Sequence, residues 1–266
     1  MSDAVPTDPW QPAQYHRFQA EREAPFLDLC AWIEPHAGAR VVDLGCGTGE
    51  LTHKLHAHVG AAHTLGLDSS AHMLAQATAP GARHHPHVTF EHGDIAAFDA
   101  PLEYDVVFSH AALHWIPDHA ALFARLAAAL RPGGQLAVQM PANFDHASQV
   151  ALREVLAEAP FADALGGKQH PRHVRSIADY AAHLHALGLA PKRVARHVYG
   201  HELPTTADAV EWMKGTTLTP YAKTLSPELY AALCTRVAHR LVEEVGDHRP
   251  YFFTFERILL WARRRP

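Results

Sequence analysis

Short apolar runs alternate with longer amphipathic stretches through the first half of the chain. The runs are rich in Val, Leu and Phe and are bounded by Gly, Asp or Pro, which is typical of strands. The stretches between them have helical spacing, as Leu122, Leu126 and Leu130 show before Pro132-Gly133-Gly134, which is expected to end that helix. We therefore expect strands at residues 40–45, 63–69, 87–94, 104–110 and 134–140, and helices at residues 50–58 and 71–78 and from residue 119 onward.

The second half of the chain is mostly helical in pattern. Helices are expected within residues 143–161, 176–189, 206–216 and 226–246, and two further strands at 192–203 and 251–264. Strands that alternate with helices predict an α/β fold with a doubly wound, mostly parallel, seven-stranded, Rossmann-like sheet. Late helical insertions are expected to cover the carboxyl ends of the strands, where such sheets bind ligands. The predicted organisation is one domain over 1–266, with an N-terminal helical lid at 1–30, a cofactor-binding core at 31–140, and helical cap elements at 141–190 and 204–248.

Composition narrows the class of protein. Hydrophobic residues make up 48% and charged residues 19%, which is typical of a globular protein, and no apolar run approaches the roughly 20 residues of a membrane span. The N-terminus has no apolar signal segment, so a cytoplasmic location without a membrane partner is expected. Three separated cysteines argue against a disulfide framework, and a short basic cluster at 263–265 does not predict nucleic-acid binding. The oligomeric state is left open.

A glycine turn follows the first predicted strand. Gly45, Gly47 and Gly49 give the spacing G-x-G-x-G, whereas the turn that binds a dinucleotide pyrophosphate has the spacing G-x-G-x-x-G. Asp43 precedes this turn and would repel a pyrophosphate but attract an ammonium or sulfonium cation. S-adenosylmethionine carries both of these cations.

Two more acidic residues follow the next two predicted strands. Asp68 lies 23 residues after Gly45, where a carboxylate accepts the hydroxyls of a ribose, and Asp94 precedes Ile95, a pair suited to an adenine amino group and ring. The stretches "VVDLGCGTG", "LGLDSS" and "HGDI" resemble the consecutive motifs of class I S-adenosylmethionine-dependent methyltransferases. The alternative is that they are ordinary turns of another doubly wound protein. With the resemblance, the cofactor-binding candidates are Tyr15, Asp43, Gly45, Gly47, Asp68, Ser69, Asp94, Ile95, Ser109 and His110.

Further stretches along the whole chain are similar to the trans-aconitate 2-methyltransferase family. They include "LAVQMP" followed by Asn143, and a late segment with Trp212 and Tyr221. The resemblance implies transfer of a methyl group from S-adenosylmethionine to a carboxylate of a small acid, most simply trans-aconitate, with S-adenosylhomocysteine as the product. Thr219 stands where the family pattern has an arginine, which raises the alternative of a less charged acid, whereas Arg257 is retained.

A carboxylate acceptor is already ionised at neutral pH, so the reaction needs alignment and electrostatics rather than a general base. His114 and Trp115 are expected to border the reacting methyl group, and a packing role is the alternative for Trp115. The acid is expected to meet several residues of the second half, of which Asn143, Trp212, Tyr221 and Arg257 are the main candidates, with His170, Arg172 and Arg175 beside them.

Close histidine pairs are frequent because the chain has 23 histidines, and no metal ion is predicted. Other functions stay open. One is the carboxyl methylation of a malonyl carrier protein, which would need a basic docking face. Another is methylation of a different small molecule, and a third is cofactor binding without turnover.

Overall fold

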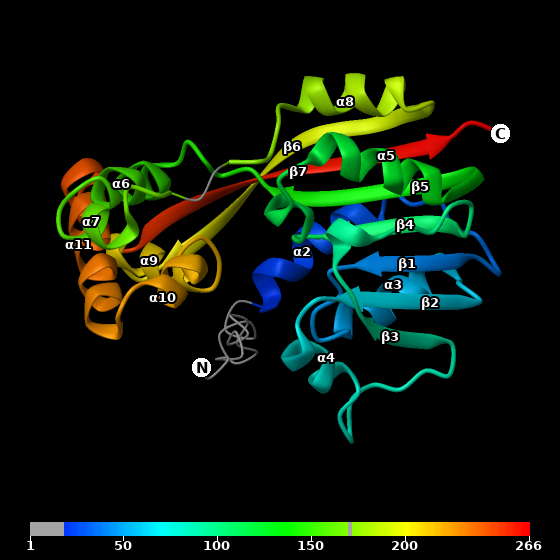
Figure 1. The fold of residues 1–266 in the computed structure, drawn as a ribbon, viewed down its shortest axis with the longest axis horizontal. Coiled ribbons are helices and arrows are strands. Elements are labelled where there is room, and N and C mark those ends of the chain that lie inside the picture. The colour runs from blue at the N-terminus through cyan, green and yellow to red at the C-terminus, as the bar shows by residue number, and fades with distance from the viewer. Residues whose placement is uncertain (1–18, 170–171) are drawn as a thin grey trace. The chain divides into compact units, whose positions relative to one another are not determined.

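The computed structural model describes residues 19–169 and 172–266. Its seven-stranded sheet has the order β3-β2-β1-β4-β5-β7-β6 (Figure 1). The pairs β1–β2, β1–β4, β2–β3 and β4–β5 are parallel, and β5–β7 is antiparallel. The strands are β1 (Arg40–Leu44), β2 (His63–Asp68), β3 (Val88–His92), β4 (Tyr104–His110), β5 (Leu130–Pro141), β6 (Leu189–Leu203) and β7 (Tyr251–Arg264). The predicted mostly parallel seven-stranded α/β fold is confirmed.

Helices connect these strands in the expected alternation. Several begin at a Ser or Asp whose side chain accepts a backbone N–H of the first turn, as Ser70 does from Met73 at 3.1 Å and Asp118 does from Ala121 at 3.0 Å. The helices are α2 (Gln19–Cys30), α3 (Glu50–Val59), α4 (Ala71–Ala77), η1 (Ile95–Ala97), η2 (Leu113–Trp115), α5 (His119–Ala129), α6 (Ala147–Leu156), α7 (Phe161–Leu165), α8 (Ile177–Ala186), η3 (Thr206–Asp208), α9 (Ala209–Lys214), α10 (Thr219–Thr224) and α11 (Pro227–Val245). None of the described helices is long and apolar enough to cross a membrane.

The boundary between α5 and β5 differs from the prediction. The leucine repeat and Pro132-Gly133-Gly134 predicted a helix through Leu130, but the helix ends at Ala129 and the strand begins at Leu130. Leu130 has extended backbone and pairs with Tyr104 of β4. The pairing shifts register between Tyr104 and Val106, so β5 includes the Pro-Gly-Gly stretch within one strand. Tertiary pairing therefore overrides the local helical pattern.

One predicted helical segment is divided in the structure, and one observed helix was not predicted. The predicted segment 143–161 consists of α6 and the short helix α7, with a break between Leu156 and Phe161. Residues 217–225 carried no helix prediction, yet α10 begins at Thr219, with Pro220 in its first turn where proline fits a helix.

The chain divides into two compact units, which we call the sheet unit and the helical unit. The sheet unit comprises residues 19–142, 173–197 and 256–266, and the described part of the helical unit comprises 143–169, 172 and 198–255. Helix α8, predicted as part of the cap, belongs to the sheet unit. The bounds of the two units do not coincide with those of the predicted core and cap. The expected single domain over 1–266 stays a prediction.

Helix α2 belongs to the core of the sheet unit. Phe26, Leu29 and Cys30 are buried in a cluster with Val41 and Phe108 of the central strands. Part of the expected N-terminal lid is therefore core, because α2 buries this apolar face against the sheet. Residues 1–18 lie outside the described residues.

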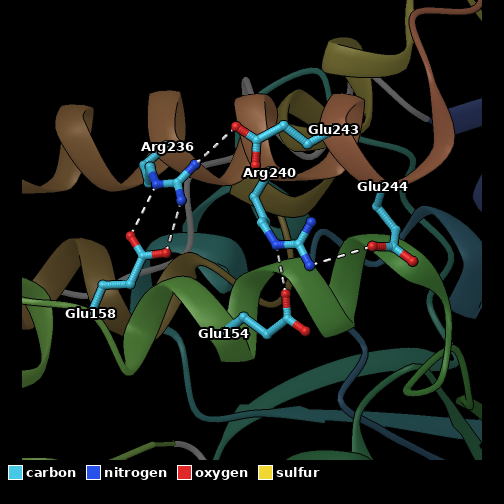
Figure 2. Close-up of polar contacts among 6 residues, drawn as sticks. All are labelled: Glu154, Glu158, Arg236, Arg240, Glu243 and Glu244. Atoms are coloured by element: carbon cyan, nitrogen blue, oxygen red, sulfur yellow. Dashed lines mark hydrogen bonds and ion pairs between the residues drawn. The ribbon is translucent and has the colours of Figure 1, made fainter.

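The helical unit has its own apolar core, built from α6, α7, α9, α10 and α11. Two arginines of α11 join this helix to the α6 segment (Figure 2). Arg236 binds both carboxylate oxygens of Glu158 at 2.9 Å, and Arg240 binds Glu154 at 2.7 Å. Glu243 and Glu244 contact the same arginines at 3.5 and 3.3 Å. The hydrogen bonds to Glu158 and Glu154 are the main reason why the pKa values of the Arg236 and Arg240 guanidinium groups are raised, and the charges of Glu243 and Glu244 add to this shift. The pairs fix the register of the two helices at the surface.

Candidate active site

The glycine turn between β1 and α3 is built by backbone conformations that suit glycine. Gly45, Gly47 and Gly49 have φ angles of 82°, 57° and 77°. A Cβ atom at Gly45 would lie 2.2 Å from Cβ of Ala112, so the turn after β4 closes directly over this glycine. The sequence motif is therefore needed both for the turn itself and for the close approach of a second loop.

Asp43 lies under this turn and is 3% exposed. The Thr52 hydroxyl of α3 donates to its Oδ2 at 2.6 Å. Burial raises the pKa of Asp43 to about 7; the Thr52 hydrogen bond opposes this shift, whereas the nearby carboxylate of Asp68 adds to it. A cation placed beside Asp43 would relieve the cost of burying this charge.

Asp68 supports the same turn from the end of β2. Its Oδ2 accepts the N–H of Gly47 at 2.8 Å, and its Oδ1 accepts the N–H of Ser70 at 2.8 Å. The N–H of Gly47, which could otherwise face a phosphate, is thus bonded to a carboxylate. This arrangement agrees with the exclusion of a pyrophosphate, and a carboxylate oxygen can accept more than one hydrogen bond. Ser69 beside it is exposed.

Asp94 and Ile95 follow β3 and differ in exposure. Asp94 is exposed and accepts the N–H of Ala96 at 2.8 Å as the N-cap of η1, whereas Ile95 is 8% exposed. An exposed carboxylate beside an apolar side chain suits an adenine, and this contact stays a prediction. Tyr15 lies outside the described residues, and the cofactor contacts of the other candidates stay predictions.

Ser109 and His110 end β4, next to β1. The Ser109 hydroxyl donates to the carbonyl of Leu44 at 2.7 Å, so it ties the ends of two strands together. His110 is 8% exposed and its ring meets Phe26 of α2 edge-on at 5.9 Å.

The turn after β4 carries both predicted catalytic residues. Ala111 has a φ angle of 54°, and its N–H donates to the carbonyl of Gln139 at 2.9 Å. His114 and Trp115 lie next in η2 with ring centroids 4.7 Å apart. Nδ1 of His114 is enclosed and has no hydrogen-bond partner among the described residues. Burial and the positive charge of Arg257 lower the pKa of His114 to about 3, so this imidazole is neutral at ordinary pH.

Two buried residues that the sequence did not single out hold η2 in place. Nε2 of His119 binds the carbonyl of Leu113 at 3.0 Å, and its Nδ1 binds the Tyr180 hydroxyl at 2.5 Å. The same hydroxyl accepts the N–H of Arg175 at 3.2 Å. His119 and Tyr180 are 61 positions apart and lie on α5 and α8, so no local sequence signal could have linked them.

Three substrate candidates lie in the helical unit and are largely buried. Trp212 is 3% exposed and packs on Phe253 and Phe255, with ring centroids 5.7 and 5.6 Å away. Tyr221 is 4% exposed within the apolar core of this unit, and Asn143 is 6% exposed. Trp212 and Tyr221 thus pack in cores of this unit, and their contact with a substrate is an open prediction.

The arginines predicted to bind the substrate belong to different units and differ in exposure. Arg257 of β7 is 3% exposed in the sheet unit and pairs in register with Pro141 of β5. Arg175 is exposed in the same unit. Arg172, in the helical unit, lies over the Phe144 ring and contacts Asp145 at 3.5 Å. His170 lies outside the described residues.

Comparisons with known proteins agree on the class of enzyme. Residues 41–134 match the model of a methyltransferase domain. The chain is 42% identical over 261 residues to a trans-aconitate 2-methyltransferase of Deinococcus radiodurans, covering 96% of this chain and 98% of that protein. It is 40% identical to a second such enzyme, from Methylobacterium nodulans, with the same coverage. The chain belongs to this methyltransferase family. A solved S-adenosylmethionine-dependent methyltransferase from Mesorhizobium loti is 26% identical, with a TM-score of 0.54 over 91% of this chain and 98% of that one.

The chain is thus an S-adenosylmethionine-dependent methyltransferase, and its residues fit that cofactor. The buried carboxyl of Asp43, with its raised pKa, is suited to a cation. The sheet order sets the acidic ends of β1, β2 and β3 side by side. This half of the sheet edge is therefore the acidic half.

Several histidines lie close together beside β2. His56 and His85 have ring centroids 4.3 Å apart, and Nδ1 of His56 is bound to the Thr64 hydroxyl at 2.9 Å. Among the described residues, no three His, Cys, Asp or Glu side chains are placed to hold a metal ion.

Proposed function

We propose that this methyltransferase forms a methyl ester on a carboxylate of a small organic acid, with trans-aconitate as the first substrate to test. The observation that carries the proposal is the 42% identity, over nearly the whole chain, to an enzyme named for that substrate. The buried Arg257 supports it, because a guanidinium is the natural partner of a carboxylate.

The reaction needs no proton transfer. S-adenosylmethionine supplies a methyl group on a sulfonium. A lone pair of the ionised acceptor oxygen forms the new O–CH₃ bond, while the C–S bond breaks and its electron pair stays on sulfur. The products are a methyl ester and S-adenosylhomocysteine, and the charges of carboxylate and sulfonium cancel.

The protein's own contribution is charge placement and exclusion of water. We infer that Asp43, Asp68 and Asp94 bind the cofactor and that Arg257 binds the acid. His114, neutral because of its low pKa, serves as a hydrogen-bonding group rather than a base, and Trp115 borders the methyl group.

Thr219 bears on which acid is used. Its hydroxyl donates to the carbonyl of Lys214 at 3.3 Å, at the start of α10, and the residue is 9% exposed. A hydroxyl in this position cannot replace the charge of an arginine. A dicarboxylate therefore belongs in the test beside the tricarboxylate.

The test is to incubate the protein with S-adenosylmethionine and a panel of mono-, di- and tricarboxylates and to detect methyl esters by mass spectrometry. We expect trans-aconitate to yield a monomethyl ester. A malonylated carrier protein is included as the alternative acceptor. Turnover of the carrier protein alone, or of no acid at all, would overturn the proposal.

A further inference from the structure

Two glutamines on one strand of the sheet unit have opposite surroundings. Gln135 and Gln139 of β5 are four positions apart, so their side chains point to the same face of the sheet. Gln135 is 3% exposed and Gln139 is 0% exposed.

The Gln135 amide is fully bonded. Its Oε1 accepts from the N–H of Glu34 at 2.8 Å and from Nε1 of Trp261 at 3.1 Å, and its Nε2 donates to the carbonyl of Glu34 at 2.8 Å. The Gln139 amide, in contrast, has no hydrogen-bond partner for either Nε2 or Oε1 among the described residues.

A buried amide without a partner destabilises a folded protein, and an apolar side chain of the same volume would be more stable there. Gln135 shows that this strand and this face can satisfy a glutamine. The amide of Gln139 therefore has a donor and an acceptor that no described residue uses, as a group that binds a ligand would have.

The register of the sheet shows where Gln139 lies. It pairs with His110, the last residue of β4, and with Leu259 of β7. Arg257 is two positions from Leu259 and points to the same face. The carbonyl of Gln139 also accepts the N–H of Ala111, where the turn to His114 begins.

Charge divides the carboxyl edge of the sheet into two halves. The acidic residues Asp43, Asp68 and Asp94 follow β1, β2 and β3, whereas β4, β5 and β7 present His110, Gln139 and Arg257 on one face. A cationic cofactor suits the acidic half, and an anionic acceptor suits the half with the amide and the guanidinium.

We propose that Gln139 binds the carboxylic acid that is methylated, by donating a hydrogen bond from Nε2 to one of its oxygens. This inference rests on the proposed function, because it takes the acceptor to be a carboxylic acid. With Arg257 nearby, it assigns two separate anchors to the acid, which favours acceptors that carry at least two carboxylates.

The test compares Gln139→Met with the matched variant Gln135→Met. Methionine has nearly the same length and volume as glutamine and removes only the amide. Thermal unfolding, the dissociation constant of S-adenosylhomocysteine, and KM and kcat for the acid that the wild-type protein methylates are measured for all three proteins.

We expect Gln135→Met to change mainly the unfolding temperature and Gln139→Met to change mainly KM for the acid. Gln135→Met loses three hydrogen bonds within the protein, so it should lower the unfolding temperature and leave KM for the acid unchanged. Gln139→Met should keep or raise the unfolding temperature, leave cofactor affinity unchanged, and raise KM for the acid about tenfold, the effect of one lost hydrogen bond. Gln139→Glu, which adds a negative charge, should raise KM further.

Two results would overturn the inference alone. One is an unchanged KM in Gln139→Met, whether or not cofactor binding is weaker, and the other is a loss of thermal stability as large as that of Gln135→Met. If the wild-type protein methylates no carboxylic acid, the proposed function fails first and the inference fails with it.

Discussion

Asp43 is a buried acid whose charge depends on the cofactor. Its raised pKa of about 7 means that the free protein holds a proton there in mild acid, and a bound cation favours the carboxylate and lowers this pKa. Cofactor affinity should therefore rise with pH up to about 7 and then level off. The effect on folding has the opposite sign: the unliganded chain loses stability as pH rises from about 4 to about 7, because the folded state binds the proton more tightly than the unfolded state.

Titration calorimetry at about pH 6, in two buffers with different ionisation enthalpies, measures how many protons are released when the cofactor binds. We expect close to one proton released for each S-adenosylmethionine bound, and none in Asp43→Asn. Thr52→Val removes the hydrogen bond that lowers the pKa of Asp43, so its affinity should level off at a higher pH. Heat of binding in the wild type that does not depend on buffer would contradict this account.

A comparison of alanine substitutions at Gly45 and Gly38 can separate the cost of a strained backbone conformation from the cost of a steric clash with a neighbouring residue. Both have φ angles near 80°, but a Cβ at Gly45 would lie 2.2 Å from Cβ of Ala112, and a Cβ at Gly38 would meet nothing within 4 Å. Each substitution to Ala should cost roughly 1 kcal/mol of stability for the backbone conformation alone. Only Gly45→Ala should also displace the turn and weaken cofactor binding by about tenfold or more. Equal cofactor affinity in the two variants would exclude this collision as a cause.

At the scale of residues, the sequence identified what local spacing can show. The glycine turn and the three acids after β1, β2 and β3 are each local motifs, and parallel strands bring their ends together. The spacing of these motifs could not show that Asp68 accepts a hydrogen bond from the N–H of Gly47, or that the Ser109 hydroxyl donates to the carbonyl of Leu44. Those contacts depend on how neighbouring strands are aligned, which a single sequence does not state.

Helix η2 depends on two other helices for its position. The Tyr180 hydroxyl of α8 joins the N–H of Arg175 to Nδ1 of His119, and Nε2 of His119 binds the carbonyl of Leu113 in η2. Tyr180→Phe removes the partner of the N–H of Arg175 and of the buried Nδ1 of His119. An unsatisfied buried group should cost roughly 1–3 kcal/mol of stability. Because η2 carries His114, kcat should fall several-fold while cofactor affinity changes little.

Unfolding by denaturant and a kcat and KM analysis of Tyr180→Phe provide the measurement. Tyr230→Phe, which removes a hydroxyl from the helical unit, is the control and should leave kcat unchanged. If Tyr180→Phe loses stability but keeps the wild-type kcat, the two residues support the fold without positioning η2.

At the scale of elements, the sequence predicted the kind of element better than its ends. Short apolar runs predicted the five parallel strands, most clearly β1 and β4, because a parallel sheet buries its central strands on both faces. The two late strands were predicted as well, although β7 is antiparallel and much of β6 is exposed. The leucine repeat before Pro132 extended α5 too far, since the pairing of Leu130 with Tyr104 decides that boundary. Helix α8 has the pattern of any amphipathic helix, so its pattern could not show whether it joined the sheet unit or the helical unit.

At the scale of the whole molecule, the two compact units share continuous strands. Along β7, Phe253 and Phe255 belong to the core of the helical unit, whereas Leu259 and Trp261 pack in the sheet unit. Strand β6 likewise passes from one unit to the other at residues 197–198. Neither unit can unfold without disturbing a strand of the other, so we expect one cooperative unfolding transition.

The ion pairs of α11 and the cofactor make this expectation testable, because each acts on one unit. Arg236→Gln with Arg240→Gln removes the bonds to Glu154 and Glu158 in the helical unit, and S-adenosylmethionine should stabilise the sheet unit by binding to it. Hydrogen exchange near the unfolding midpoint is followed in α11 and in β4. For a cooperative molecule the double variant should speed exchange of both segments and the cofactor should slow exchange of both. If each change affects only the segment in its own unit, the chain consists of two domains that unfold independently, and the strands they share do not couple them.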